Sequence, residues 1–234
     1  MGIVKKNIVE LPIGEIKGID NMFGRQMKFD VGNVPARYRK VFDKTRKDIF
    51  DTMKVSAIVD SFEIDAVTED SVRLRNGVVL ESSMLARVFR RSSELVFYVV
   101  SAAGYEALDE AEENMAAKLF LDSWGTAVIE CASEQFKKNI AKELEKQGIY
   151  ATFAFSPGQH NVSMELQKVI FDLLAPGEIG VTLNEFYLMH PKKSVSGIFG
   201  IGPDPDEEKL RPCDFCDLRE NCSSAYTDEI IGDE

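Results

Sequence analysis

The sequence predicts an α+β fold in which helices and strands do not alternate regularly. Two apolar runs rich in β-branched residues, 55–62 and 95–101, have the composition of buried strands. Asn76-Gly77 separates two short apolar segments and is a strong hairpin signal, which indicates antiparallel pairing. Residues 105–147 are rich in Ala, Glu and Lys, with apolar residues at helical spacing. These uneven blocks favour a mixed α+β sheet over a doubly wound parallel one.

Turn signals dominate residues 1–33, where Leu11-Pro12-Ile13-Gly14 indicates an extended N-terminal arm. A helix is expected from Pro35 to Met53, because apolar residues recur there near helical spacing and proline suits a first helical turn. The elements expected next are strands at 55–62, 71–74 and 78–80 and a short helix at 84–91.

The second half begins with a buried strand at 95–101, after which Gly104 opens the long helical region. Two helices are expected there, 105–121 and 123–147, with Gly148 as the natural stop. A helix that begins at Ser163 and ends before Ala175-Pro176-Gly177 is also expected. The strands predicted around it are 150–155, 179–181, 186–189 and 195–201.

Composition limits the classes of partner. The 234 residues are 44% hydrophobic, enough for one large domain or two small ones. The net charge is −11, and residues 203–234 carry eleven Asp/Glu against three Lys/Arg, a net of −8 that leaves −3 for residues 1–202. This balance argues against nucleic acid as a partner. Neither a signal-peptide pattern nor a membrane-length apolar run is present, so a cytoplasmic protein without a membrane partner is expected.

Three segments follow from these patterns: an N-terminal arm at 1–33, an α+β domain at 34–202 and an acidic, cysteine-rich tail at 203–234. Three of the four cysteines, Cys213, Cys216 and Cys222, form a C-x2-C-x5-C pattern in the tail. Thiolates at this spacing can converge on one soft metal, whereas three cysteines cannot all pair as disulfides. We expect an iron–sulfur cluster, with zinc as the alternative and a free-thiol tail as the third possibility.

Two motifs bracket the helix expected at 163–174. Residues 154–160, Ala-Phe-Ser-Pro-Gly-Gln-His, describe a strand that enters a Ser-Pro-Gly turn, and residues 189–197 read Met-His-Pro-Lys-Lys-Ser-Val-Ser-Gly. Between them lies Gly-Val-Thr-Leu-Asn-Glu at 180–185. Over roughly residues 95–202 this order resembles the activation domain of cobalamin-dependent methionine synthase, and more closely the stand-alone anaerobe proteins of that family, which end in a cysteine cluster.

The resemblance implies a curved, mainly antiparallel sheet with helices packed around it. In the family, this domain binds S-adenosylmethionine and caps the cobalamin, where it supports the one-electron reduction of cob(II)alamin and its remethylation. The resemblance therefore implies a corrinoid (cobalamin) protein as partner. It also implies an accessory role, because the homocysteine, folate and cobalamin modules of the whole enzyme have no counterpart in this sequence.

The family's ligand-binding positions carry over to six residues. They are Glu130 on the long helix, Ser156, Gly158 and Gln159 in the turn, and Ser194 and Ser196 in the last strand. The family has arginine where this chain has Ala154, and tyrosine where it has Gln159. Loss of a cationic clamp for a carboxylate weighs against S-adenosylmethionine as the ligand.

Other polar residues near the motifs have open roles. His160 and His190, the only histidines, are candidates for a metal ligand, a cobalt contact, a proton carrier or a loop hydrogen bond. Lys192-Lys193 could meet corrin propionates or amides or form a solvated turn. Cys131, far from the other cysteines in sequence, is expected to be a buried inert thiol.

Two main hypotheses of function follow, and neither predicts a catalytic side chain, since no Gly-x-Ser-x-Gly elbow accompanies the serines. In the first, the chain docks on a corrinoid protein and supports reductive reactivation and methyl transfer, with the tail cluster delivering the electron. In the alternative, it is a small-molecule binding module on the same fold, with structural zinc in the tail and no catalysis. A pure interaction scaffold with free thiols is a third possibility.

Overall fold

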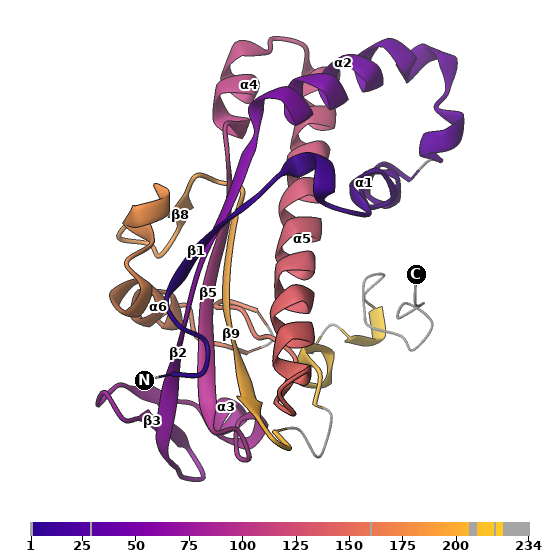
Figure 1. The fold of residues 1–234 in the computed structure, drawn as a ribbon. Coiled ribbons are helices and arrows are strands. Elements are labelled where there is room, and N and C mark those ends of the chain that lie inside the picture. The colour runs from indigo at the N-terminus through magenta and orange to yellow at the C-terminus, as the bar shows by residue number, and fades with distance from the viewer. Residues whose placement is uncertain (1, 29, 160, 206–209, 218, 222–234) are drawn as a thin grey trace.

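The computed structural model describes residues 2–28, 30–159, 161–205, 210–217 and 219–221. Its main sheet has seven strands, all paired antiparallel. These strands are β1 (Asn7–Leu11), β2 (Lys54–Val67), β3 (Ser71–Leu74), β4 (Val79–Glu81), β5 (Glu94–Ala103), β6 (Tyr150–Ala151) and β9 (Ser194–Gly202). The helices are α1 (Ile19–Met27), α2 (Ala36–Thr52), α3 (Ser83–Val88), α4 (Tyr105–Ala111), α5 (Met115–Glu145) and α6 (Leu166–Leu174). The predicted α+β fold with a curved antiparallel sheet is confirmed (Figure 1).

The strand order is β4-β3-β2-β5-β9-β6, with β1 on the outer edge of β2. Because β2 has 14 residues, one of its edges accommodates two partners in succession, β1 beside its first half and β3 beside its second. The hairpin predicted at Asn76-Gly77 joins β3 to β4 and is confirmed. Two further short strands, β7 (Thr182–Leu183) and β8 (Met189–His190), form a separate hairpin.

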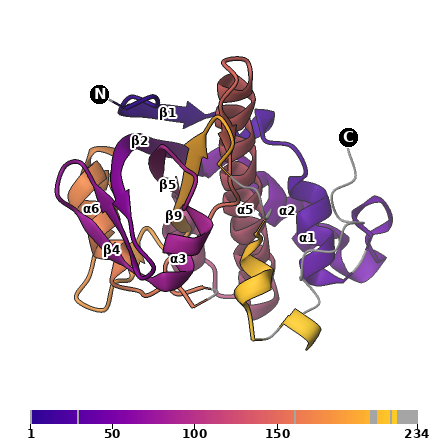
Figure 2. The same ribbon diagram turned by 90° about the horizontal axis from the view of Figure 1, so that it is seen from below.

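Strand β5 explains the three-layer arrangement, because it is buried on both faces. Val96, Tyr98 and Val100 belong to the core on the α5 side, whereas Leu95 and Phe97 belong to the core on the side of α3 and α6. Figure 2 shows α5 on one side of the sheet and α6 on the other. A near-continuous apolar run is what a strand between two helical layers requires.

The long helical region is interrupted earlier than its sequence predicts. Two helices were expected to meet near residue 122, but α4 ends at Ala111 and α5 continues unbroken from Met115. Asn114 starts α5, because its Oδ1 accepts hydrogen bonds from the N–H groups of Ala116 at 2.9 Å and Ala117 at 3.2 Å.

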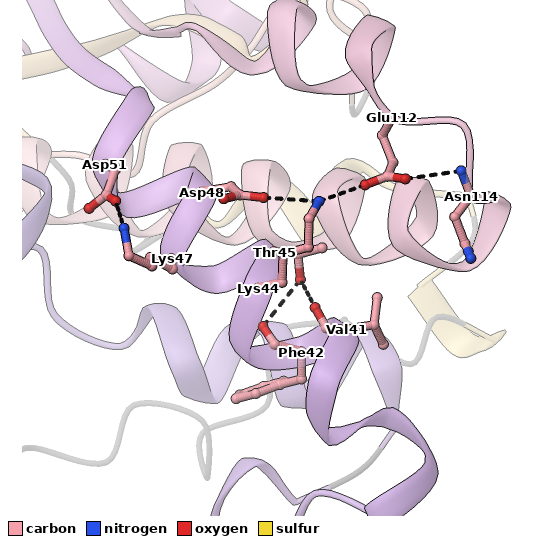
Figure 3. Close-up of polar contacts among 9 residues, drawn as sticks. All are labelled: Val41, Phe42, Lys44, Thr45, Lys47, Asp48, Asp51, Glu112 and Asn114. Carbon is pink, nitrogen blue, oxygen red and sulfur yellow. Dashed lines mark hydrogen bonds and ion pairs between the residues drawn. The ribbon is translucent and has the colours of Figure 1, made fainter.

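Glu112 ties the break between α4 and α5 to helix α2, as Figure 3 shows. Its Oε1 accepts from the N–H of Asn114 at 3.0 Å, and its Oε2 accepts from Lys44 Nζ at 2.8 Å. The hydrogen bond from Lys44 is the main reason why the pKa of Glu112 lies below its ordinary value. Lys44 also lies 3.3 Å from Asp48 within α2, so its ammonium group contacts one carboxylate in its own helix and one at the break between α4 and α5.

Residues 1–33, expected as an arm, contribute both a strand and a helix to the α+β domain. Strand β1 lies along β2, and α1 packs against α5. The Phe23 ring stacks on the indole of Trp124 with centroids 3.7 Å apart. Both side chains are fully buried, so this segment completes the core on the α5 side.

Differences from the expected elements concentrate between residues 150 and 190. The predicted strand 150–155 is only β6 plus a single bridge from Phe155 to Ile198, and the helix expected from Ser163 begins at Leu166. The strand expected at 186–189 is mostly a turn, because Asn184 Oδ1 accepts from the N–H groups of Phe186 and Leu188, both at 2.9 Å. No helix in the described parts of the chain is long and apolar enough to cross a membrane.

Candidate functional site

A cleft opens where the chain after β6 leaves the edge of β9. Thr152 and Phe155 follow this edge and hydrogen-bond to Gly200 and Ile198, with N···O distances of 2.9 and 2.8 Å. At Ser156-Pro157 the chain turns away, so the next part of β9 borders a half-open space of about 380 Å³. The turn, the start of α6, the β7–β8 hairpin and β9 enclose it.

The cleft brings together four of the six predicted ligand-binding residues: Ser156, Gln159, Ser194 and Ser196. Gln167 and Lys192 are the other polar side chains on its wall. The rest of its lining is apolar or aromatic and consists of Pro157, Met164, Tyr187, Leu188, Met189 and Val195. A mostly apolar wall with a few convergent polar groups is typical of a small-molecule site.

Tyr98 supports the turn from behind. Its side chain is 1% exposed, and its hydroxyl is hydrogen-bonded with Ser156 and Ser133. Burial raises the pKa of this phenol, so it remains a neutral hydrogen-bonding group. Sequence reasoning missed Tyr98; the available signal was a single hydroxyl-bearing ring in the otherwise apolar run 95–100. In the structure Tyr98 faces Gly197 of the neighbouring strand.

Gly158 shapes the turn rather than the wall of the cleft. Its φ is +74°, and a Cβ there would lie 2.3 Å from Met164 Sδ, so no other residue fits without displacement. The turn is closed by hydrogen bonds from Gly158 N–H to the carbonyl of Val162 at 3.0 Å and from Val162 N–H to the carbonyl of Gln159 at 2.9 Å. These bonds hold Gln159 in place at the cleft.

The two serines of β9 face the same side, as their alternation predicts. Ser196 is buried, and its Oγ donates to Gln167 Oε1 at 2.7 Å. Ser194 Oγ donates to the carbonyl of Pro191 at 2.7 Å and lies 2.9 Å from the Oγ of Ser101. Both hydroxyls are oriented by the protein, which leaves no activated nucleophile at these positions.

The lysine pair divides into two roles. Lys193 turns inward, where its Nζ donates to Asp122 Oδ1 at 2.7 Å and Thr126 Oγ1 at 2.8 Å and lies 4.6 Å from the centre of the Tyr105 ring. Lys192 is exposed and lies at the cleft. Only Lys192 therefore remains available to a charged ligand.

The chain resembles the MetH reactivation domain. A crystal structure of that domain bound to AdoHcy has a TM-score of 0.63 and 16% sequence identity, covering 88% of this chain and 80% of that one. No protein-family model matches the sequence, and no curated protein matches it. The likeness to the MetH reactivation domain confirms the expected fold.

Glu130, which the resemblance placed among the ligand-binding residues, is exposed on α5 and does not line the cleft. Its neighbour Cys131 is half-buried against the core. Burial, with a smaller contribution from Glu130, raises the pKa of the Cys131 thiol to about 11. A thiol in this setting stays protonated, which agrees with the expected inert role.

The described part of the tail packs beside the turn. The centroids of the Phe215 and Phe155 rings are 6.0 Å apart, and the Phe215 carbonyl accepts a hydrogen bond from Asn161 Nδ2 at 3.0 Å. On either side of Phe215 are Cys213, which is buried, and Cys216, which is half-buried.

Three further candidate metal ligands were named from the sequence. Cys222 in the tail and His160 beside the turn lie outside the described residues, and His190 is exposed in β8. Within the described ranges, no three His, Cys, Asp or Glu side chains are grouped as a metal site. The three-thiolate ligand set therefore stays a prediction.

Proposed function

We propose that this chain is an accessory protein of corrinoid-dependent methyl transfer, which binds a small molecule in the cleft and docks on a separate corrinoid protein. The observation that carries the proposal is the cleft itself, formed by the 156–159 turn and the Ser194–Ser196 stretch. It occurs in a fold shared with a domain whose crystal structure contains AdoHcy.

The cleft suits positioning rather than covalent chemistry. Its hydroxyl groups at Ser194 and Ser196 are already engaged with protein acceptors, so they can orient a ligand but are not poised to attack one. The partner's corrinoid would supply the methyl-accepting and redox chemistry. This chain would hold a methyl donor or its product in place and exclude water from it.

The mouth of the cleft carries apolar side chains that fit a docking surface. Phe186 is 68% exposed and Leu188 59% exposed, both in the loop between β7 and β8, and Leu188 also lines the cleft. Met164 on the other side of the cleft is 37% exposed. Large exposed apolar groups gathered beside a ligand site are typical of an interface. A partner seated here would cover the ligand.

The tail would hold an iron–sulfur cluster through Cys213, Cys216 and Cys222, with zinc as the alternative. Two observations support a soft metal: both described donors are thiols, and the Cys216 N–H donates to the Cys213 carbonyl at 3.3 Å, which closes a turn between them. Packing of Phe215 against the sheet places this segment beside the ligand turn. Iron and acid-labile sulfide in protein purified without oxygen would support electron delivery. Zinc would favour the binding-module hypothesis.

Titration calorimetry of the intact chain with AdoHcy and S-adenosylmethionine tests the ligand part of the proposal. Binding of AdoHcy is expected, because the cleft offers neutral hydrogen-bonding groups and an apolar wall. S-Adenosylmethionine is expected to bind more weakly than AdoHcy. Both ligands carry a carboxylate for which Ala154 and Gln159 provide no charged clamp, but only S-adenosylmethionine has a sulfonium cation, and the described lining residues include no carboxylate to balance it. Absence of heat with both compounds would reject this ligand class and leave a binding module for another small molecule.

A further inference from the structure

Gln167, in the first turn of α6, is a buried amide with half of its hydrogen-bonding capacity unused. Its side chain is 2% exposed, and its Oε1 accepts from Ser196 Oγ at 2.7 Å. Its Nε2 has no hydrogen-bond partner among the described residues, although Gln167 lines the cleft. A buried donor without an acceptor costs stability, so its presence in a cleft wall requires a reason.

Two other buried polar atoms share this condition, Ser92 Oγ and Trp124 Nε1, and neither residue lines the cleft. Trp124 lies in the aromatic cluster around Phe23, and Ser92 lies against Gly200. Gln167 is thus the one described residue that combines an unpartnered buried donor with a place on the wall of the cleft.

The charges around the cleft restrict what can meet this donor. No carboxylate is found among the described lining residues, and their only cation, Lys192, is exposed. A charged group buried beside Gln167 would have no counter-charge at hand, which is strongly unfavourable. The inner end of a ligand must therefore be uncharged, while an anionic group is tolerated toward Lys192.

We propose that Gln167, fixed by Ser196, donates through Nε2 to an uncharged acceptor on the inner end of the ligand, such as a heterocyclic nitrogen or a carbonyl oxygen. This inference rests on the proposed small-molecule function of the cleft. Met164 lies three residues before Gln167, in the turn that leads into α6, and also lines the cleft. Because Nε2 is covered in this structure, donation to a ligand requires a lining side chain to shift, and the flexible thioether of Met164 is suited to this.

Affinity for AdoHcy, whose adenine ring carries uncharged acceptor nitrogens, is the first readout. Gln167→Met keeps the length of the side chain and removes the donor, so AdoHcy should bind about tenfold more weakly. Gln135→Met is the matched control. The Gln135 amide is satisfied on both sides, since Nε2 donates to the Glu15 carbonyl at 3.1 Å and Oε1 accepts from Lys17 N–H at 3.0 Å, and it does not line the cleft. The affinity of the Gln135→Met variant for AdoHcy should equal that of the wild type.

The melting temperature of the ligand-free protein is the second readout. Replacing both partners by apolar groups, Gln167→Met with Ser196→Ala, removes the unpartnered donor and should leave the melting temperature equal or higher. Gln135→Met should lower it, because two hydrogen bonds are lost.

The two readouts separate the possible failures. Wild-type affinity in Gln167→Met would overturn the proposed role of Gln167 while leaving the ligand function of the cleft intact. If AdoHcy does not bind the wild type, the proposed ligand class fails. The melting temperature of the double variant then tests whether the Gln167 amide is kept for a ligand or for stability. A melting temperature of the double variant at or above that of the wild type supports the inference that the Gln167 amide is kept for a ligand. A clear decrease means that the amide is structural and overturns the inference.

Discussion

The phenol oxygen of Tyr98 lies over Gly197, only 2.5 Å from the position that a Cβ at residue 197 would take. The two residues face each other on β5 and β9. A glycine at this place lets the tyrosine cross the neighbouring strand and reach Ser156 at the start of the ligand turn. The position of the turn therefore depends on a side chain two strands away from β6.

Gly197→Ala should lower the free energy of unfolding by about 1–3 kcal/mol, because the added methyl group collides with the Tyr98 hydroxyl and the Phe155 carbonyl. Gly14→Ala is the control, since no atom lies within 4 Å of the added methyl group there. Denaturant unfolding of both variants gives the comparison. Equal stability of the two would mean that Tyr98 does not pass over residue 197 as described.

Lys193→Met should destabilise the protein by about 1–2 kcal/mol, because it removes charged hydrogen bonds to Asp122 and Thr126 in a side chain that is 11% exposed. Lys192→Met, one position earlier, should leave stability within about 0.5 kcal/mol of the wild type. The same unfolding measurement tests both. A larger effect at Lys192 would reverse the roles assigned to the pair.

Cys131 should react slowly with iodoacetamide, and its rate should keep rising with pH. A thiol whose pKa is raised from 9.0 to about 11 has about a hundredfold less thiolate near pH 8, and its thiolate fraction grows tenfold per pH unit up to the pKa. Alkylation of a variant with Cys131 as its only cysteine, followed from pH 7 to 10, measures this. An alkylation rate that stops rising near pH 9 would contradict the raised pKa of the Cys131 thiol.

Phe215→Ala should release the cysteine segment from the sheet, because the contact with Phe155 is lost. Faster alkylation of Cys213, which is buried in the wild type, is the expected result in metal-free protein. Phe186→Ala, which removes an exposed ring in the β7–β8 loop, serves as control. An unchanged rate at Cys213 would show that Phe215 does not anchor the segment.

The sequence predicted those features that depend on local chemistry. The Asn76-Gly77 hairpin, the doubly buried strand around residues 95–101 and the shared face of Ser194 and Ser196 follow from turn geometry and side-chain periodicity. Helix α1 was missed although Ile19, Met22, Phe23 and Met27 follow helical spacing, because the surrounding glycines and prolines dominate residues 1–33.

Features that depend on tertiary contacts could not be predicted from local sequence patterns. The break between α4 and α5 depends on Glu112, which is held by Lys44 from α2, and no local pattern reveals that pairing. Gln167 reads as an ordinary helix residue until the fold places it against Ser196 at the cleft. The serines and the turn named from the sequence lie together at the cleft, and their role in binding stays a prediction. Tyr98 and Gln167 were not singled out, because their positions at the cleft arise from packing.

The proposed role in corrinoid-dependent methyl transfer is tested by complex formation with a cobalamin-carrying protein of the methionine synthase type. The same experiment measures the yield of methylcobalamin from S-adenosylmethionine under a low-potential reductant. Size-exclusion chromatography detects the complex, and the absorption spectrum of the corrinoid reports its redox and methylation state. Co-elution and a higher methylcobalamin yield are expected when the chain is present. Leu188→Asp, at the mouth of the cleft, should reduce both. No complex, and a corrinoid spectrum that does not change when the chain is added, would contradict a role in corrinoid-dependent methyl transfer.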